Sequence, residues 1–230
     1  MVFDPLYFVF LAPALVLSMW ASFKTKSAFN KYSKVRTMNG MTGAQAAKVM
    51  LDRAGIRDVE IKAIPGKLTD HYNPINKTLA LSAPVHGTPS IAAGGVACHE
   101  AGHAIQHARA YKPMWLRSIL VKPAKFGSML GFYGMMIGLM MSSMQLFMLG
   151  VLLFSGLLAF QLVTLPVEFD ASNRAKKLAV EYGIVAAQER QGMDKVLNAA
   201  ALTYVAAAAS SIMQLLYFLM RAGLLGGSRD

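Results

Sequence analysis

Long uncharged stretches alternate with polar, basic segments along this chain. The first stretch, residues 5–23 (PLYFVFLAPALVLSMWASF), carries no charge over about the length that a helix needs to cross a bilayer. Tyr7 and Trp20 lie near its two ends, and aromatic residues at those positions are typical of membrane interfaces. The stretch therefore predicts a first transmembrane helix.

A second, longer run without charge extends over residues 126–166. It is long enough for two crossings, and the polar break at residues 142–145 (SSMQ) predicts a hairpin between transmembrane helices two and three. Glycines recur in the first of these helices at spacings near four, which predicts close approach of another helix. They are Gly127, Gly131, Gly134 and Gly138.

A third uncharged run, residues 197–220, is rich in alanine and only moderately hydrophobic. Its length predicts a fourth transmembrane helix. A helix buried against the other three is the alternative, because its small side chains suit tight packing.

The polar segments have patterns of their own. Residues 42–54 (TGAQAAKVMLDRA) combine a threonine cap signal with apolar spacing of helical period, and Gly55 follows them. Residues 56–63 and 77–82 alternate apolar and polar positions, as half-buried strands do. We expect one short helix here and two or three strands.

Composition and charge support a membrane protein. Hydrophobic residues make up 55% of the 230 and charged residues only 15%, which is more apolar than an average soluble chain. The formal net charge is +11, but no basic stripe with interleaved aromatics points to nucleic acid. Instead, 21 of the 23 Lys and Arg residues fall within residues 24–125 and 167–198. By the positive-inside rule both segments face the cytoplasm and the N-terminus lies outside.

The single cysteine, Cys98, excludes an internal disulfide and a cysteine zinc cluster. Cys98 directly precedes His99 in the sequence. Adjacent residues on a helix point about 100° apart, so the two side chains do not share a face. We interpret Cys98 as a small buried thiol.

Residues 99–107 (HEAGHAIQH) contain the pattern H-E-x-x-H. On a helix, His99 and His103 stand one turn apart on the same face and can hold one Zn²⁺, while Glu100 can act as general base toward a zinc-bound water. The alternative is an amphipathic helix with two surface histidines. We expect this helix to begin at a Thr88-Pro89 cap and to run to about Arg109, with close approach of a neighbour at Gly94 and Gly95.

Two histidines require a third protein ligand if one position is left for water. His107 is about 12 Å from His99 along the helix axis, too far to share one ion. Glu168 opens the apolar side of the helical pattern that follows it and is the preferred ligand. Asp170, on a solvated row, and His71 remain alternatives, and a carboxylate at a helix N-terminus is the structural alternative for Glu168.

Five stretches together resemble the YugP-type bacterial neutral zinc metallopeptidases. They are FDP near the N-terminus, LTDHYNP at 68–74, HEAGHAIQ at 99–106, QLVTLPVEFDAS at 161–172 and VLNAAALTYVAAA at 196–208. The resemblance covers nearly the whole chain. It implies an integral zinc-dependent endopeptidase of the cytoplasmic membrane, with His99, His103 and a downstream carboxylate as ligands and Glu100 as the catalytic residue.

The chain is also similar, more distantly, to the HtpX and CAAX prenyl peptidases, whose ligand glutamate lies in a motif E-x-x-x-D. Glu168 matches the start of that motif, but Ser172 stands where the aspartate would be, so the residue supporting the ligand is open. The site-2 proteases place their zinc motif inside a membrane segment. Arg109 and Lys112 follow the motif here, which argues against that class.

The sequence thus predicts a mainly α, polytopic membrane protein with about four transmembrane helices and a small α+β, zincin-like cytoplasmic domain. The expected parts are transmembrane helix 1 (5–23), the zinc-peptidase domain (24–125), transmembrane helices 2 and 3 (126–166), a helical segment with the third ligand (167–198) and transmembrane helix 4 (197–220).

The expected function is zinc-dependent hydrolysis of polypeptides, with the active site facing the cytoplasm of a bacterium. The alternative is a metal-binding membrane scaffold or adaptor without turnover. Intact Glu100 favours the enzyme, because a purely structural zinc site needs no base. The substrate, the oligomeric state and any membrane partner stay open.

Overall fold

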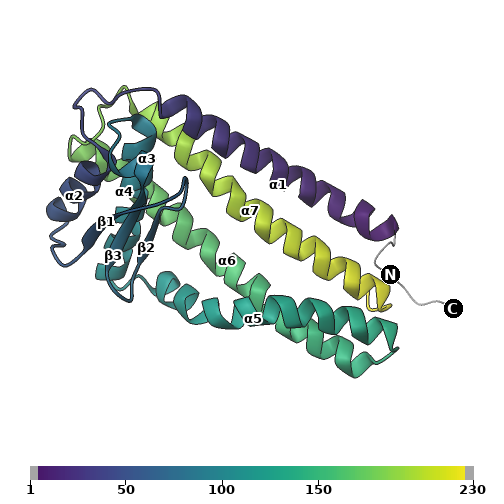
Figure 1. Ribbon diagram of the computed structural model, residues 1–230. Helices are drawn as coiled ribbons and strands as arrows, with labels where there is room; N and C mark the ends of the chain where they lie inside the picture. Colours follow the sequence, from purple (N-terminus) through teal and green to yellow (C-terminus); the bar gives the residue numbers. More distant parts are fainter. Residues whose placement is uncertain (1–4, 226–230) are drawn as a thin grey trace. The chain divides into compact units, whose positions relative to one another are not determined.

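The structure, a computed structural model, describes residues 5–225. These residues are mainly helical, with one small mixed sheet (Figure 1), as expected. The helices are α1 (Pro5–Tyr32), α2 (Gly43–Arg53), α3 (Ala83–His86), α4 (Ile91–Ala108), α5 (Lys112–Met140), α6 (Met144–Glu181) and α7 (Arg190–Arg221). The strands are β1 (Glu60–Ile64), β2 (His71–Asn73) and β3 (Thr78–Ser82).

The described chain divides into two compact units. The helical unit comprises residues 5–21, 115–165 and 203–225, and the sheet unit comprises residues 22–114 and 166–202. Long helices contribute residues to both, so that α6 belongs to the helical unit up to Leu165 and to the sheet unit from Pro166.

In the helical unit, α5 and α6 form a hairpin whose backbones come very close. A Cβ atom on Gly131 would lie 2.5 Å from the backbone nitrogen of Phe154, and one on Gly138 would lie 2.5 Å from that of Phe147. The turn between the helices falls at the predicted polar break and contains Ser142 with a φ of 53°. The expected glycine contact between helices is therefore confirmed.

Three described helices, α1, α6 and α7, are long and apolar enough to cross a membrane. The expected transmembrane helix 2, in the first part of residues 126–166, is not among them, for a reason that the bounds of α5 make clear. Its first half carries four cations up to Lys125, and it ends at Met140. The uncharged part, residues 126–140, spans about 22 Å at 1.5 Å per residue, less than the roughly 30 Å of a hydrocarbon core.

Helix α6 also differs from expectation, because it continues through Pro166 instead of ending there. A proline removes one backbone donor, but long apolar helices tolerate this where other groups compensate.

The sheet unit has a core in which α2, α3 and α4 pack with one another and with the sheet (Figure 1). The strand order is β1-β3-β2, with β3 parallel to β1 and antiparallel to β2. Helix α2 begins after Thr42, whose side chain forms the predicted cap as a reciprocal pair with Gln45. The predicted helix and the presence of strands are confirmed, but β1 begins at Glu60 and not at Ile56, and β3 is buried at every position instead of half-buried.

The start of α4 was predicted two residues too early. Its N-cap is Ser90, whose hydroxyl accepts a hydrogen bond of 3.2 Å from the amide of Ala93, so Thr88 is not the cap. A Cβ on Gly95 would lie 3.2 Å from Met193 Cγ, as close approach predicts, but one on Gly94 would meet nothing within 4 Å. The helix ends at Ala108, close to the predicted Arg109.

Candidate metal centre

Helix α4 places His99 and His103 one turn apart on one face. Their rings meet edge to face with centroids 4.8 Å apart, and His103 is 5% exposed. The spacing of four residues produces this stacking, because it nearly equals one helical turn. Gly102 lies just before His103 and permits α6 to pack closely: a Cβ there would lie 2.8 Å from the carbonyl oxygen of Ala171.

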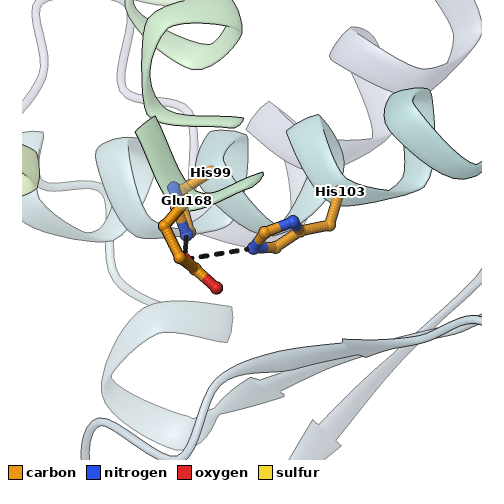
Figure 2. Close-up of side chains that lie close together, drawn as sticks. All are labelled: His99, His103 and Glu168. Atoms are coloured by element: carbon orange, nitrogen blue, oxygen red, sulfur yellow. Dashed lines mark hydrogen bonds and ion pairs between the residues drawn. The ribbon is translucent and has the colours of Figure 1, made fainter. Parts of the chain in front are cut away.

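Helix α6 supplies Glu168, which is only 2% exposed. Its Oε2 atom lies 3.2 Å from Nε2 of His99 and 3.4 Å from Nε2 of His103 (Figure 2). One potential ligand atom from each residue falls within 4.8 Å of the others. The structure thus brings together the three residues expected as ligands, although 64 residues lie between His103 and Glu168.

The second nitrogen of each imidazole is also engaged. Nδ1 of His99 lies 3.1 Å from the hydroxyl of Ser172, and Nδ1 of His103 lies 3.0 Å from Oε1 of Gln106. Partners of this kind orient metal-binding histidines and fix which nitrogen carries the proton. Ser172 therefore stands beside His99, at the position where the more distant families have aspartate.

Sequence reasoning missed Gln106. It lies three residues after His103 on α4, a spacing at which side chains on a helix meet. That spacing is a signal that could have found it, but its other contacts, to α6, are visible only in the fold.

Glu100 lies on α4 directly after His99 and is 8% exposed. It is not one of the three residues whose ligand atoms gather. Since adjacent helical residues point about 100° apart, its carboxylate belongs beside the histidine face and not on it. This placement is compatible with a base next to a metal site.

The other residues considered from sequence have contacts elsewhere. Asp70 accepts hydrogen bonds from the backbone and hydroxyl of Ser82, and His71 Nδ1 lies 2.9 Å from the carbonyl oxygen of Thr69. His107 Nδ1 lies 2.8 Å from the Tyr72 hydroxyl. None of these three joins the gathered ligand atoms among the described residues.

Two ionisable groups, Cys98 on α4 and Tyr72 beside its end, have raised pKa values. Burial raises the pKa of the Cys98 thiol to about 12. Burial, with the nearby charge of Asp58 adding to it, raises the pKa of Tyr72 to about 12. Cys98 thus behaves as a buried core thiol, as the sequence predicted.

The donor set fits zinc. Two imidazole nitrogens and one carboxylate oxygen are the protein ligands of many catalytic zinc sites, which keep a fourth position for water or substrate. Softer thiolate ligands are absent from the group, and a site for Mg²⁺ or Ca²⁺ would consist of oxygen ligands. Two histidines favour zinc over those ions.

A helix with H-E-x-x-H and a carboxylate from a second helix defines the class of zinc metallopeptidases. In agreement, a model of the family described as "Putative neutral zinc metallopeptidase" matches residues 7–223. The chain belongs to this family.

One curated relative is the "Putative membrane protease YugP" of Bacillus subtilis (strain 168). The two are 47% identical over 214 residues, which cover 93% of this chain and 95% of the relative. No solved structure matches the chain.

Proposed function

We propose that this protein is a membrane-embedded zinc endopeptidase in which His99, His103 and Glu168 are the metal ligands and Glu100 is the general base. The observation that carries the proposal is the convergence of both Nε2 atoms on one carboxylate oxygen of Glu168, at 3.2 and 3.4 Å. The glutamate as third ligand makes the arrangement gluzincin-like. Family membership supports the same chemistry.

Zinc held by these residues would act as a Lewis acid, polarising the scissile carbonyl and lowering the pKa of water. Glu100 takes a proton from the attacking water as its oxygen bonds to the carbonyl carbon. Glu100 then delivers that proton to the amide nitrogen as the carbon–nitrogen bond breaks. The products are a carboxylate and an amine, and no covalent enzyme intermediate forms.

The proposed setting is the cytoplasmic membrane of a bacterium, with several crossings and the site facing the cytoplasm. Three helices of sufficient length and apolarity support the crossings, and the name of the Bacillus subtilis relative supports the membrane. The placement of 21 of 23 cations in residues 24–125 and 167–198 supports the orientation. The substrate class is polypeptide exposed at or near the inner surface of the bilayer.

The experiment that tests the function uses the full chain purified in detergent and an unfolded polypeptide as substrate. Wild type should contain zinc and cleave, a chelator should stop cleavage, and added zinc should restore it. Glu100→Gln should keep its zinc and lose roughly 100- to 10,000-fold in rate, the usual contribution of a general base. Glu181→Gln, at an exposed glutamate on α6, is the control and should cleave normally.

The outcomes separate the candidate functions. Wild type that binds zinc without cleaving any polypeptide would support the metal-binding scaffold. Cleavage retained by Glu100→Gln would contradict the proposed base. Loss of zinc in that variant would instead show that Glu100 helps to bind the metal.

The orientation needs its own test. Single cysteines at Lys48 and at Arg221, placed in a Cys98→Ala background, are exposed in intact cells to a membrane-impermeant maleimide. With four crossings residue 221 lies outside and should be labelled, whereas with three it lies in the cytoplasm and should be protected. Lys48 should be protected in intact cells in either case. Labelling of residue 48 in intact cells would contradict the cytoplasmic orientation.

A further inference from the structure

Gln106 is the polar side chain most completely enclosed beside the candidate metal centre. It is 0% exposed and makes three hydrogen-bond contacts. Its Oε1 lies 3.0 Å from Nδ1 of His103, and its Nε2 donates to the carbonyl oxygen of Val167 and to Oδ2 of Asp170, each at 2.8 Å. A buried amide with this many partners is held in one orientation.

The partners decide which way the amide points. A backbone carbonyl and an ionised carboxylate can only accept hydrogen bonds, so the NH₂ group must face Val167 and Asp170. The amide oxygen then faces His103 and can only accept, which requires a proton on Nδ1. A neutral imidazole with its proton on Nδ1 has its lone pair on Nε2, the nitrogen that lies 3.4 Å from Glu168.

The carboxylate of Asp170 is itself hydrogen-bonded to a second side chain, that of Arg174. The guanidinium Nε of Arg174 donates to the same Oδ2 atom at 2.6 Å, one helical turn along α6. The guanidinium carbon of Arg174 lies 5.8 Å from the ring centroid of Tyr111. Asp170 Oδ2 therefore accepts hydrogen bonds from both Gln106 and Arg174.

His99 is supported differently. Its Nδ1 faces the hydroxyl of Ser172, which can donate or accept. A hydroxyl does not select one tautomer, whereas the anchored amide of Gln106 does. Of the two histidines, only His103 has its protonation pattern set by its neighbour.

We propose that Gln106 is a positioning residue that fixes the tautomer and orientation of His103, with Asp170 and Arg174 anchoring its amide. The inference rests on the proposed function, because it assigns Gln106 to the metal centre. Asp170, a candidate ligand from sequence, acts through Gln106 in this arrangement.

The test measures zinc affinity by competition with a chelator, on the purified full chain. Gln106→Leu should weaken zinc binding by roughly 10- to 100-fold, the range found when supporting partners of metal ligands are lost. The absorption spectrum of Co²⁺ bound in place of zinc should also change, since it reports ligand geometry. Gln188→Leu, at an exposed glutamine outside the site, should match wild type in both measurements.

Asp170→Ala provides a second variant if Gln106→Leu fails to fold, because Asp170 is partly exposed. One donor contact of Gln106, to Val167, remains in it, so zinc affinity should fall less than in Gln106→Leu. Asp194→Ala is the matched control: Asp194 also pairs with an arginine four residues away, Arg190 at 3.7 Å, but on α7. Its zinc affinity should equal that of wild type.

The results distinguish the inference from the proposed function. A wild type that takes up no zinc would overturn both. A wild type that binds zinc while Gln106→Leu binds equally well, with an unchanged Co²⁺ spectrum, would overturn the inference alone. If only Asp170→Ala folds, zinc affinity equal to that of Asp194→Ala would overturn it.

Discussion

Gly102 on α4 lies directly against the backbone of Ala171 on α6. A Cβ atom on Gly102 would lie 2.8 Å from the carbonyl oxygen of Ala171. Ala171 lies one helical turn after Glu168, and Gly102 precedes His103, so this contact sets the distance between the carboxylate and the histidines. The missing side chain is what allows the two helices to bring the three residues together.

Gly102→Ala should therefore weaken zinc binding without touching any ligand. The methyl group must push α6 away, and overpacking of this kind costs typically 1–3 kcal/mol. Zinc affinity and the free energy of unfolding should both fall, as chelator competition and denaturant titration would measure.

Gly94→Ala is the matched control on the same helix. A Cβ there meets nothing within 4 Å, and alanine favours a helix by about 1 kcal/mol over glycine. It should leave zinc affinity unchanged and stabilise the protein slightly. Equal effects from the two substitutions would contradict the role given to the contact between Gly102 and Ala171.

Glu168→Ala should remove most of the bound zinc. The substitution deletes one of three ligands, so zinc affinity should fall by more than the roughly 10- to 100-fold typical of a supporting residue. Atomic absorption on the purified protein measures the metal directly. Glu181→Ala, an exposed glutamate on the same helix, should keep full zinc content. Full zinc content in Glu168→Ala would contradict Glu168 as the third ligand and would favour Asp170 or His71 in that role.

That His99, His103 and Glu168 come together could be predicted from sequence, because each of them leaves a local signal. The two histidines are four residues apart, and Glu168 begins an apolar helical row. The support from Ser172 and the anchoring of Gln106 left no such signal, because contacts with His99, Val167 and Asp170 arise only when α4 and α6 pack. These contacts between α4 and α6 depend on the tertiary structure, which a local sequence pattern does not encode.

The same distinction explains the fold. The cap at Thr42 and the turn between Met140 and Met144 are local features, and both follow from the predicted cap and polar break. Continuation of α6 through Pro166 was not predicted, because a long apolar helix tolerates a proline where other groups compensate for the lost backbone donor. The expected crossing in α5 was read from a run without charge, but the helix ends at Met140, after only part of that run.

Cys98 should be inert toward thiol reagents in the folded protein. It is 0% exposed, so a maleimide cannot reach the sulfur without local unfolding. Labelling at neutral pH should be negligible in mild detergent and complete in strong denaturant, as mass spectrometry would show. Lys48→Cys in a Cys98→Ala background should label at once, because the Lys48 side chain is 61% exposed. Rapid labelling of native Cys98 would show that α4 opens beside His99.

The glycines of α5 should be essential for the hairpin in the helical unit. Gly131→Ala places a methyl group 2.5 Å from the backbone nitrogen of Phe154, and backbone on α6 cannot yield as a flexible side chain can. An interface built on small residues loses its close packing when one of them is enlarged. The free energy of unfolding in detergent should therefore fall by about 1–3 kcal/mol, as is usual for overpacking. Gly156→Ala on α6 meets nothing within 4 Å and should be neutral. Zinc affinity should stay normal in both variants, since the ligands belong to the sheet unit; a loss of zinc in Gly131→Ala would show that packing in the helical unit controls the metal centre.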